Sequence, residues 1–145
     1  MVVRHLVAED LDPVTALESS VLSSWNREQI AEELQRPAGI CLVAQGEDGE
    51  LLGWCCGLGS GIDVEILKVT VNSVRRRIGV AFALLEELQR IFAGKGGGQL
   101  FLEVRSQNVP AFALYAKLGF KEVGIRRNYY KNPVDNAHVL TRRLD

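Results

Sequence analysis

One acidic residue interrupts an otherwise aliphatic stretch that is predicted to form a β-strand. Residues such as Leu, Phe and Val favour a strand from Gln99 to Arg105, and Glu103 lies inside it. Side chains alternate along a strand, so Glu103 points away from Leu102 and Val104. An ionised carboxylate packed in an apolar layer would be costly. Glu103 should therefore face a cleft, where it could act as a general base, or a surface, where it would pair with Arg105 or another arginine.

A second candidate site is the start of the helix that follows the predicted strand Val64 to Val71. Between the two stand Arg75, Arg76 and Arg77, and then Gly79. The first turn of a helix has about four unpaired N–H groups and a partial positive charge, which suits a phosphate. The segment contains neither GxxxxGK[ST] nor GxGxxG, so it is not predicted to be a P-loop or a dinucleotide fingerprint. The alternative is an ordinary strand-to-helix connection with solvated arginines.

Two polar side chains, Asn108 and Tyr115, belong to a helix that is predicted to begin near Pro110 and to end at Gly119. A separation of seven residues is about two helical turns, so the two side chains share a face, on which Ala111 leaves room. A tyrosine hydroxyl can donate a proton in catalysis. The common alternative is a structural tyrosine at the end of a helix.

The cysteines and histidines do not suggest a metal site. The spacing of Cys41, Cys55 and Cys56 matches no metal-binding motif, and Cys55 and Cys56 are expected to point to opposite faces of a strand. We therefore expect the three thiols to be small core residues in a reducing compartment. His5 and His138 are far apart in the sequence, and we expect neither to bind a metal or to act in catalysis.

The hydrophobic pattern predicts a single domain over residues 1–145 in the α/β (α+β) class, with a mixed sheet and helices on both faces. Because a helix separates the strands Val64–Val71 and Gln99–Arg105, these two should be parallel neighbours. The other predicted strands are Val2–Val7, Ile40–Ala44, Leu51–Leu58, Phe120–Arg126 and His138–Arg143. Helices are predicted after the caps Asp12 and Asn26, from Gly79 to Phe92, and from Pro110, and an irregular loop is predicted from Arg127 to Asn136.

Composition narrows the classes of partner. The chain has 145 residues and a net charge of −1, which gives no reason to expect nucleic acid or an anionic membrane as partner. Charged residues interrupt the N-terminus, and no apolar run reaches the roughly 18 residues of a membrane span. We therefore expect a cytoplasmic protein, and composition indicates no particular oligomeric state.

The motif Arg76-x-x-Gly79-x-Ala81 after a strand, followed further on by Asn108 and Tyr115, resembles the GCN5-related N-acetyltransferase (GNAT) superfamily. In that superfamily the Arg/Gln-x-x-Gly-x-Gly/Ala turn binds the pyrophosphate of acetyl-CoA. The stretches LEVRSQN, ALYAKLGF and IRRNYY resemble more specifically the bacterial ribosomal-protein-alanine N-acetyltransferases of the RimI type. The resemblance implies a mostly antiparallel sheet whose two central parallel strands splay apart and hold the cofactor between them.

The resemblance also implies roles for individual residues. Glu103 would be the general base and Tyr115 the general acid, while Tyr130 and Arg127 would help to bind the acceptor. Acetyl-CoA would be the cosubstrate, and no metal is implied. The implied cofactor-binding residues are Val69, Thr70, Val71, Arg76, Arg77, Ile78, Gly79, Val80, Ala81, Phe82 and Asn108.

Three positions depart from the family pattern. Lys68 stands where the family often has Asn, Ser73 where it usually has Pro, and Phe82 where many relatives have Arg. The change at Phe82 removes one cation beside the predicted phosphate site. None of the three replaces a residue of the implied chemistry.

The sequence therefore predicts an N-α-acetyltransferase that acetylates the N-terminus of a protein or peptide, with a ribosomal protein as the leading candidate. Two alternatives stay open. One is an enzyme of the same fold that acetylates a small amine or a lysine. The other is an acyl-CoA-binding regulatory module without turnover.

Overall fold

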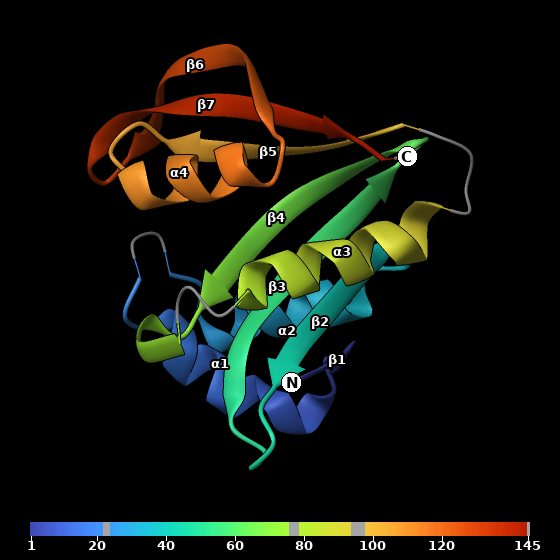
Figure 1. The fold of residues 1–145 in the computed structure, drawn as a ribbon. Helices are drawn as coiled ribbons and strands as arrows, with labels where there is room; N and C mark the ends of the chain where they lie inside the picture. Colours follow the sequence, from blue (N-terminus) through green and yellow to red (C-terminus); the bar gives the residue numbers. More distant parts are fainter. Residues whose placement is uncertain (22–23, 76–78, 94–97, 145) are drawn as a thin grey trace.

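Seven β-strands form one sheet in the order β1-β2-β3-β4-β5-β7-β6 (Figure 1). The computed structural model describes residues 1–21, 24–75, 79–93 and 98–144, with only the backbone of Arg75. All neighbouring strands are antiparallel except β4 and β5, which are parallel, so the predicted mixed sheet is confirmed. The strands are β1 Val2–His5, β2 Gly39–Gln45, β3 Leu51–Ser60, β4 Asp63–Val71, β5 Gln99–Arg105, β6 Lys121–Lys131 and β7 Val134–Arg143.

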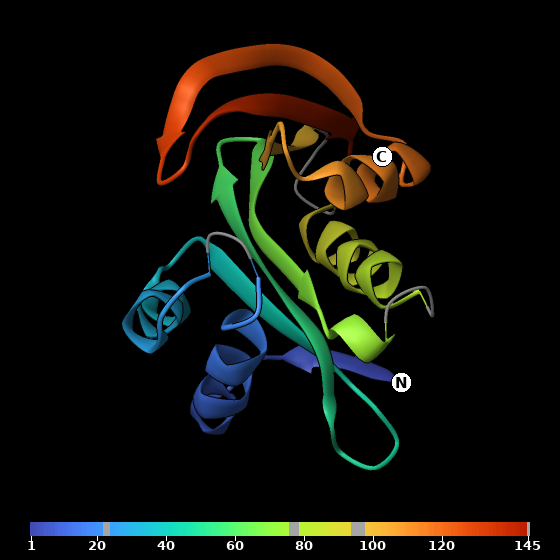
Figure 2. The same cartoon turned by 90° about the vertical axis from the view of Figure 1, so that its left-hand side faces the viewer.

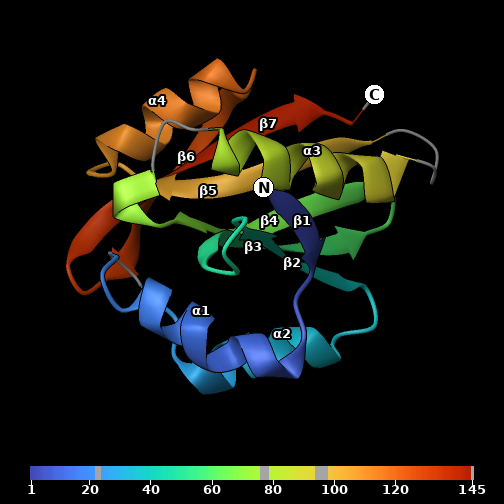
Figure 3. The same cartoon turned by 60° about the horizontal axis from the view of Figure 1, so that its bottom comes forward.

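In the described part of the chain, four α-helices cover the two faces of the sheet, as predicted. The helices α1 and α2 lie on one face, and α3 and α4 lie on the other (Figures 2 and 3). No described helix is both long enough and apolar enough to cross a membrane. The helices are α1 Leu11–Glu18, α2 Arg27–Gln35, α3 Val80–Ala93 and α4 Val109–Lys117, with short 3-10 turns at Ala8–Asp10 and Ser73–Arg75.

Alternation along the strands divides the apolar side chains between two cores. On the α3/α4 face the strands pack against Leu84 and Leu88 of α3, which are fully buried. Burying each of these leucines contributes about 1.5–3 kcal/mol. A smaller core on the α1/α2 face surrounds Trp54 of β3. Cys55 joins the first core and Cys56 the second, which confirms the prediction that the two point to opposite faces.

The two parallel strands diverge soon after they meet. β4 pairs with β5 only at Val64↔Leu100 and Glu65↔Phe101. On its other side β4 remains paired with β3 as far as Val71, with a register shift at Cys56 and Gly57 of β3. The sheet therefore opens between the C-terminal halves of β4 and β5, as the family resemblance implied.

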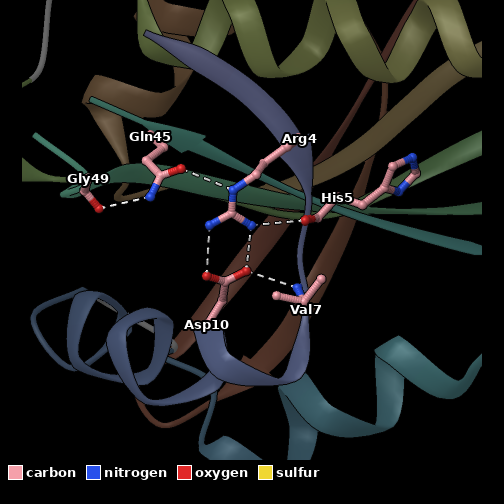
Figure 4. Close-up of polar contacts among 6 residues, drawn as sticks. All are labelled: Arg4, His5, Val7, Asp10, Gln45 and Gly49. Carbon is pink, nitrogen blue, oxygen red and sulfur yellow. Dashed lines mark hydrogen bonds and ion pairs between the residues drawn. The ribbon is translucent and has the colours of Figure 1, made fainter. Parts of the chain in front are cut away.

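The first helix begins earlier than predicted. α1 begins at Leu11, before the predicted cap Asp12. At the junction, both carboxylate oxygens of Asp10 accept hydrogen bonds from Arg4 of β1, at 2.8 and 3.0 Å, and one also accepts the N–H of Val7 (Figure 4). The hydrogen bond from Arg4 holds the pKa of Asp10 below its ordinary value. A contact between β1 and this junction thus replaces the predicted local cap.

Two of the predicted helix starts and one helix end are confirmed. Asn26 accepts the N–H of Gln29 at 2.9 Å, and the Gln29 side chain accepts the N–H of Asn26 at 2.8 Å, which is a capping box. Asn108 caps α4 by accepting the N–H of Ala111 at 3.3 Å. Beyond α4, Gly119 has φ +86°, the left-handed conformation that glycine adopts without strain.

The predicted irregular loop over residues 127–136 is wrong for most of its length. β6 and β7 run through this segment as a long hairpin, with two residues between them. The ladder is irregular, because its register shifts between Arg126 and Tyr130 and Asn128 has φ +52°. Asparagine tolerates that conformation better than most residues. Exposed polar side chains together with this irregularity hide the two-residue period of the strand.

Candidate functional site

The C-terminal half of β4 forms one edge of the gap in the sheet. Val69 pairs with Cys55 and Val71 with Gly53 on the β3 side, while no residue of β5 pairs with this half of the strand. Backbone groups that point toward β5 are therefore available to an extended ligand. Val69, Thr70 and Val71 lie where the family resemblance implies the cofactor arm.

The start of α3 lies beside the end of β4. Gly79 has φ +80°, and its carbonyl accepts the N–H of Ala83 at 2.9 Å, so it directly precedes the helix. Val80, the first residue of α3, packs over β3 at Gly53. A Cβ at Gly53 would lie 2.9 Å from the Thr70 carbonyl oxygen and 3.0 Å from Val80 Cγ1. This close packing brings the N-terminus of α3 to the gap.

The rest of the predicted anion-binding turn is only partly described. Ala81 is buried, whereas Phe82 is exposed. Among the described residues, no heavy atom beyond the neighbours of Gly79 in the chain lies within 4 Å of the position of a Cβ there. The predicted cofactor-binding residues Arg76, Arg77 and Ile78 lie outside the described residues, and their role stays a prediction.

Glu103 lies on the α1/α2 face of β5, beside the gap. Its side chain is 16% exposed, and Oε1 lies 3.6 Å from Nε of Arg126 on β6. Its other oxygen, Oε2, is buried and has no hydrogen-bond donor among the described residues. The structure thus combines both interpretations of the sequence, because one oxygen pairs with an arginine and the other is a buried acceptor without a partner.

A second carboxylate shares this face. Glu65 on β4 is partly buried, and burial, followed by repulsion from Glu103, raises the pKa of Glu65. Arg126 and Arg36 oppose this shift. The gap is therefore lined with negative charge on the side of α1 and α2, and this charge favours a cationic amine. Among the described residues, no group of three or more His, Cys, Asp and Glu side chains could hold a metal ion.

Tyr115 lies on the opposite side of the sheet. It is a buried residue of α4 in the core on the α3/α4 face, and its ring contacts Phe120 edge-on at a centroid distance of 5.5 Å. Burial raises the pKa of Tyr115, with a smaller contribution from Cys55. The phenol therefore stays protonated at neutral pH, as a proton donor must.

Asn108 caps the helix that carries Tyr115. Because its side-chain oxygen accepts the N–H of Ala111, a contact with a cofactor would use the amide nitrogen, Nδ2. Asn108 therefore fixes the start of α4, and Tyr115 lies near the other end of the same helix.

The predicted acceptor residues on β6 differ in their surroundings. Tyr130 packs under Arg105, whose Cζ lies 4.1 Å from the ring centroid. Burial, and next the negative charge of Glu103, raise the pKa of Tyr130, so the structure brings Tyr130 near Glu103. Arg127 is exposed, and no ion pair involves it in the part of the chain that the structure describes. The contacts thus tie Tyr130 to the site and leave Arg127 apart from it.

Sequence reasoning missed Glu18, a fully buried carboxylate at the end of α1. Glu18 accepts hydrogen bonds from Trp54 Nε1 at 2.8 Å, from the backbone N–H of Trp25 at 3.0 Å and from the Thr70 hydroxyl. Nζ of Lys68 lies 3.4 Å from Oε2, the oxygen that also accepts the N–H of Trp25, while Trp54 and Thr70 donate to Oε1. Burial lowers the pKa of Lys68, and Glu18 opposes that shift. These contacts fix the half of β4 that borders the gap.

A signal for Glu18 was present in the sequence. Leu11, Val14 and Glu18 are the buried residues of α1, at the spacing i, i+3 and i+7 of one helical face. A glutamate on the apolar face of a helix requires a buried partner. Lys68, a departure from the family pattern, is its partner on β4.

Comparison with known proteins agrees with this geometry. Residues 7–120 match the acetyltransferase (GNAT) family. A Bacillus subtilis (strain 168) protein with the provisional name ribosomal protein bS18-alanine N-acetyltransferase is 32% identical over 145 residues, covering 95% of this chain and 92% of the relative. The N-alpha-acetyltransferase RimI of Mycobacterium tuberculosis (strain H37Rv) is 35% identical over 125 residues, covering 83% and 75% of the two chains.

A solved structure shows the same architecture. The crystal structure of the ribosomal-protein-S18-alanine N-acetyltransferase from Escherichia coli superposes with a TM-score of 0.87 at 26% identity. The superposition covers 99% of this chain and 94% of that one. The arrangement of strands and helices around the gap is therefore shared over nearly the full length of both chains.

Proposed function

Because the chain belongs to the GNAT family of N-acetyltransferases, which use acetyl-CoA, we propose that it acetylates the N-terminal α-amine of a protein. The first candidate acceptor is a ribosomal protein, since the names of two similar proteins specify ribosomal protein bS18 or S18. One observation carries the proposal: a buried carboxylate oxygen without a donor, on Glu103, borders the gap from one face, and the phenol of Tyr115 is buried on the other.

The cofactor would lie in the gap between β4 and β5. Its arm would bind along Val69, Thr70 and Val71, through the backbone groups of this segment that point toward β5, and its pyrophosphate would bind at the N-terminus of α3. The fit rests on the divergence of the strands and on the room that the described residues leave at Gly79, where a ligand can approach the backbone. In this position the thioester would be open to the α1/α2 face and its sulfur to the α3/α4 face.

Proton removal from the acceptor is assigned to Glu103. An α-amine has a pKa of about 8, so at neutral pH most of it is protonated and not nucleophilic. The carboxylate of Glu103 takes a proton from the ammonium, directly or through one water. The neutral nitrogen then attacks the acetyl carbonyl carbon, and the backbone N–H of Val69 stabilises the developing oxyanion.

Proton delivery to the leaving group is assigned to Tyr115. As the C–N bond forms and the C–S bond breaks, the CoA sulfur departs as a thiolate with a pKa of about 8.5, like that of a cysteine. The Tyr115 hydroxyl gives it a proton, and Tyr115 is later reprotonated from solvent. No covalent acetyl-enzyme is needed in this mechanism, because the acceptor nitrogen attacks the thioester carbonyl directly.

The proposal is tested by thiol release from acetyl-CoA with a panel of acceptors. Peptides with a free N-terminal Ala or Ser should be acetylated, whereas the same peptides with a blocked N-terminus and an internal lysine should not. Turnover only with lysine side chains or polyamines would replace the proposal by the small-amine or lysine alternative. Binding of CoA without thiol release for any acceptor would favour the regulatory module.

A further inference from the structure

Two thiols outside the acetyl-transfer site face each other across the strands β2 and β3. Cys41 is directly opposite Cys56 in the antiparallel register, and their Sγ atoms are 3.7 Å apart. Both cysteines are free, and both belong to the core on the α1/α2 face. Cys55 points to the other face and is opposite Leu42, which has no thiol.

The register places the two backbones at a distance that a disulfide spans. Directly opposite residues of an antiparallel pair have Cα atoms about 4.5–5.5 Å apart, and disulfides join Cα atoms about 4.4–6.8 Å apart. Small rotations of the two side chains would therefore bring the Sγ atoms of Cys41 and Cys56 from 3.7 Å to bonding distance. The strands need not move for the bond to form.

The surroundings give the two thiols different roles. Cys41 is 5% exposed and Cys56 is fully buried, so an oxidant reaches Cys41 first. The neighbouring Cys56 thiol lowers the pKa of Cys41, because it can donate a hydrogen bond to the thiolate. The same contact and burial raise the pKa of Cys56. A carboxylate oxygen of Glu33 on α2 lies 3.9 Å from Cys56 Sγ and can accept its proton.

We propose that Cys41 and Cys56 form a modification site, at which a hydroperoxide oxidises the two thiols to a reversible cross-strand disulfide. With hydrogen peroxide, the Cys41 thiolate attacks one oxygen, the O–O bond breaks, and a sulfenic acid forms while the departing hydroxide takes a proton from solvent to become water. Cys56 Sγ then attacks Cys41 Sγ as its proton passes to Glu33, and hydroxide leaves and is protonated to water. The two thiols lose two electrons, and the peroxide is reduced to two waters. This site is independent of the proposed acetyl transfer.

The test uses the full-length chain, oxidised with hydrogen peroxide and then alkylated under denaturing conditions. The number of alkylated cysteines should fall from three to one, and a thiol reductant should restore all three. Cleavage after Glu47 and Glu50 separates Cys41 from the other cysteines, so a peptide linked to that of Cys41 shows that Cys41 is one of the two partners. Unchanged alkylation of all three cysteines, or overoxidation of Cys41 with no cross-link, would overturn the proposal.

Variants identify the partner. Cys55→Ala is the matched control and should form the cross-link as the wild type does. Cys56→Ala should stop at a sulfenic acid on Cys41 that dimedone traps, and Cys41→Ala should lose the cross-link. The Cys55→Ala chain alone decides the pairing if the other variants do not fold. A cross-link that disappears in Cys55→Ala would show that the wrong thiol had been assigned.

Discussion

The two faces of the sheet, one covered by α1 and α2 and the other by α3 and α4 (Figure 2), differ in the side chains that they bring to the β4–β5 gap. The face covered by α1 and α2, here called the charged face, carries Glu18, Glu65, Lys68 and Glu103 with their partners. The face covered by α3 and α4, here called the apolar face, presents Tyr115 within the larger core. The charged face attracts a cationic amine. The apolar face keeps the phenol of Tyr115 in its neutral form.

This difference follows from the alternation of side chains along a strand. Neighbouring residues of β5 point to opposite faces, so Leu102 and Val104 can build the core while Glu103, between them, faces the ligand side. The proposed base and the proposed acid are consequently separated by the sheet, and neither can neutralise the other directly. The thioester would lie between them, in the gap.

The largest effect should come from breaking the ion pair that supports the charged face. Glu18→Gln keeps the shape and an acceptor for Trp54 but leaves the Lys68 ammonium buried without its counter-charge. We expect a loss of about 3 kcal/mol in the free energy of unfolding, measured by urea denaturation. Lys68→Met and the double variant complete a double-mutant cycle.

The double variant should be more stable than Glu18→Gln alone, because it removes an ammonium group that has lost the carboxylate of Glu18. If instead the two losses add without coupling, the ion pair does not hold the charged face together. The hydrogen bonds from Trp54 and Thr70 would then be the contacts that matter.

The next largest effect tests the proposed base. Glu103→Gln should lower kcat/KM for an N-terminal peptide by about 10²-fold at neutral pH, as loss of a general base does. Its stability should change little, because the partner Arg126 is 60% exposed and such pairs contribute little. Glu47→Gln, in the exposed hairpin turn between β2 and β3, is the matched control and should keep the wild-type rate. An unchanged rate for Glu103→Gln would remove Glu103 from the mechanism.

A smaller effect is expected on the apolar face. Tyr115→Phe should lower kcat about 10-fold, because the thiolate, with a pKa of about 8.5, can depart partly unassisted. The KM for acetyl-CoA should stay near the wild-type value, since the ring and its contact with Phe120 are retained. Steady-state kinetics, with acetyl-CoA varied, separates the two constants.

The free energy of unfolding of Tyr115→Phe, set beside that of Glu18→Gln, compares the two faces. Removing a hydroxyl from an apolar core should not lower the free energy of unfolding, in contrast to removing the charge of Glu18. A Tyr115→Phe enzyme with an unchanged kcat would show that Tyr115 is a core residue and that another group protonates the thiolate.

How far the sequence predicts each face depends on how local the signals are. The helix α3 and the strands β4 and β5 have strong apolar patterns, and their predicted positions agree closely with the structure. The alternation around Glu103 also indicated that it would leave the core. The apolar face was therefore largely predictable, because its buried residues recur in the sequence with the period of a helix or a strand.

The charged face was harder to predict, because its contacts join residues far apart in the chain. The hydrogen bonds of Glu18 with Trp54 and Thr70 span 36 and 52 residues, and no local pattern encodes them. The end of the β6–β7 hairpin, residues 127–136, supplies Tyr130 and was predicted as a loop, because most side chains in this part of β6 are exposed and its register is irregular. Polar segments of this kind acquire their structure from pairing with a neighbour, here β7.

The smallest expected effect is on the free energy of unfolding, and it tests whether the carboxylates of the charged face lower stability. Burial and Glu103 raise the pKa of Glu65, so the folded chain binds this proton more tightly than the unfolded chain does. Wild-type stability should therefore fall as pH rises from the unfolded glutamate pKa, about 4.3, through the higher folded value. Glu65→Gln removes this loss, so its free energy of unfolding at neutral pH should be higher, though by no more than about 0.5 kcal/mol because solvent screens this partly exposed charge. Below the unfolded pKa both chains are uncharged at this position, and the gain should disappear. If Glu65→Gln is less stable at neutral pH, then Arg126 and Arg36 already compensate the charge, and the two faces differ in polarity but not in stability.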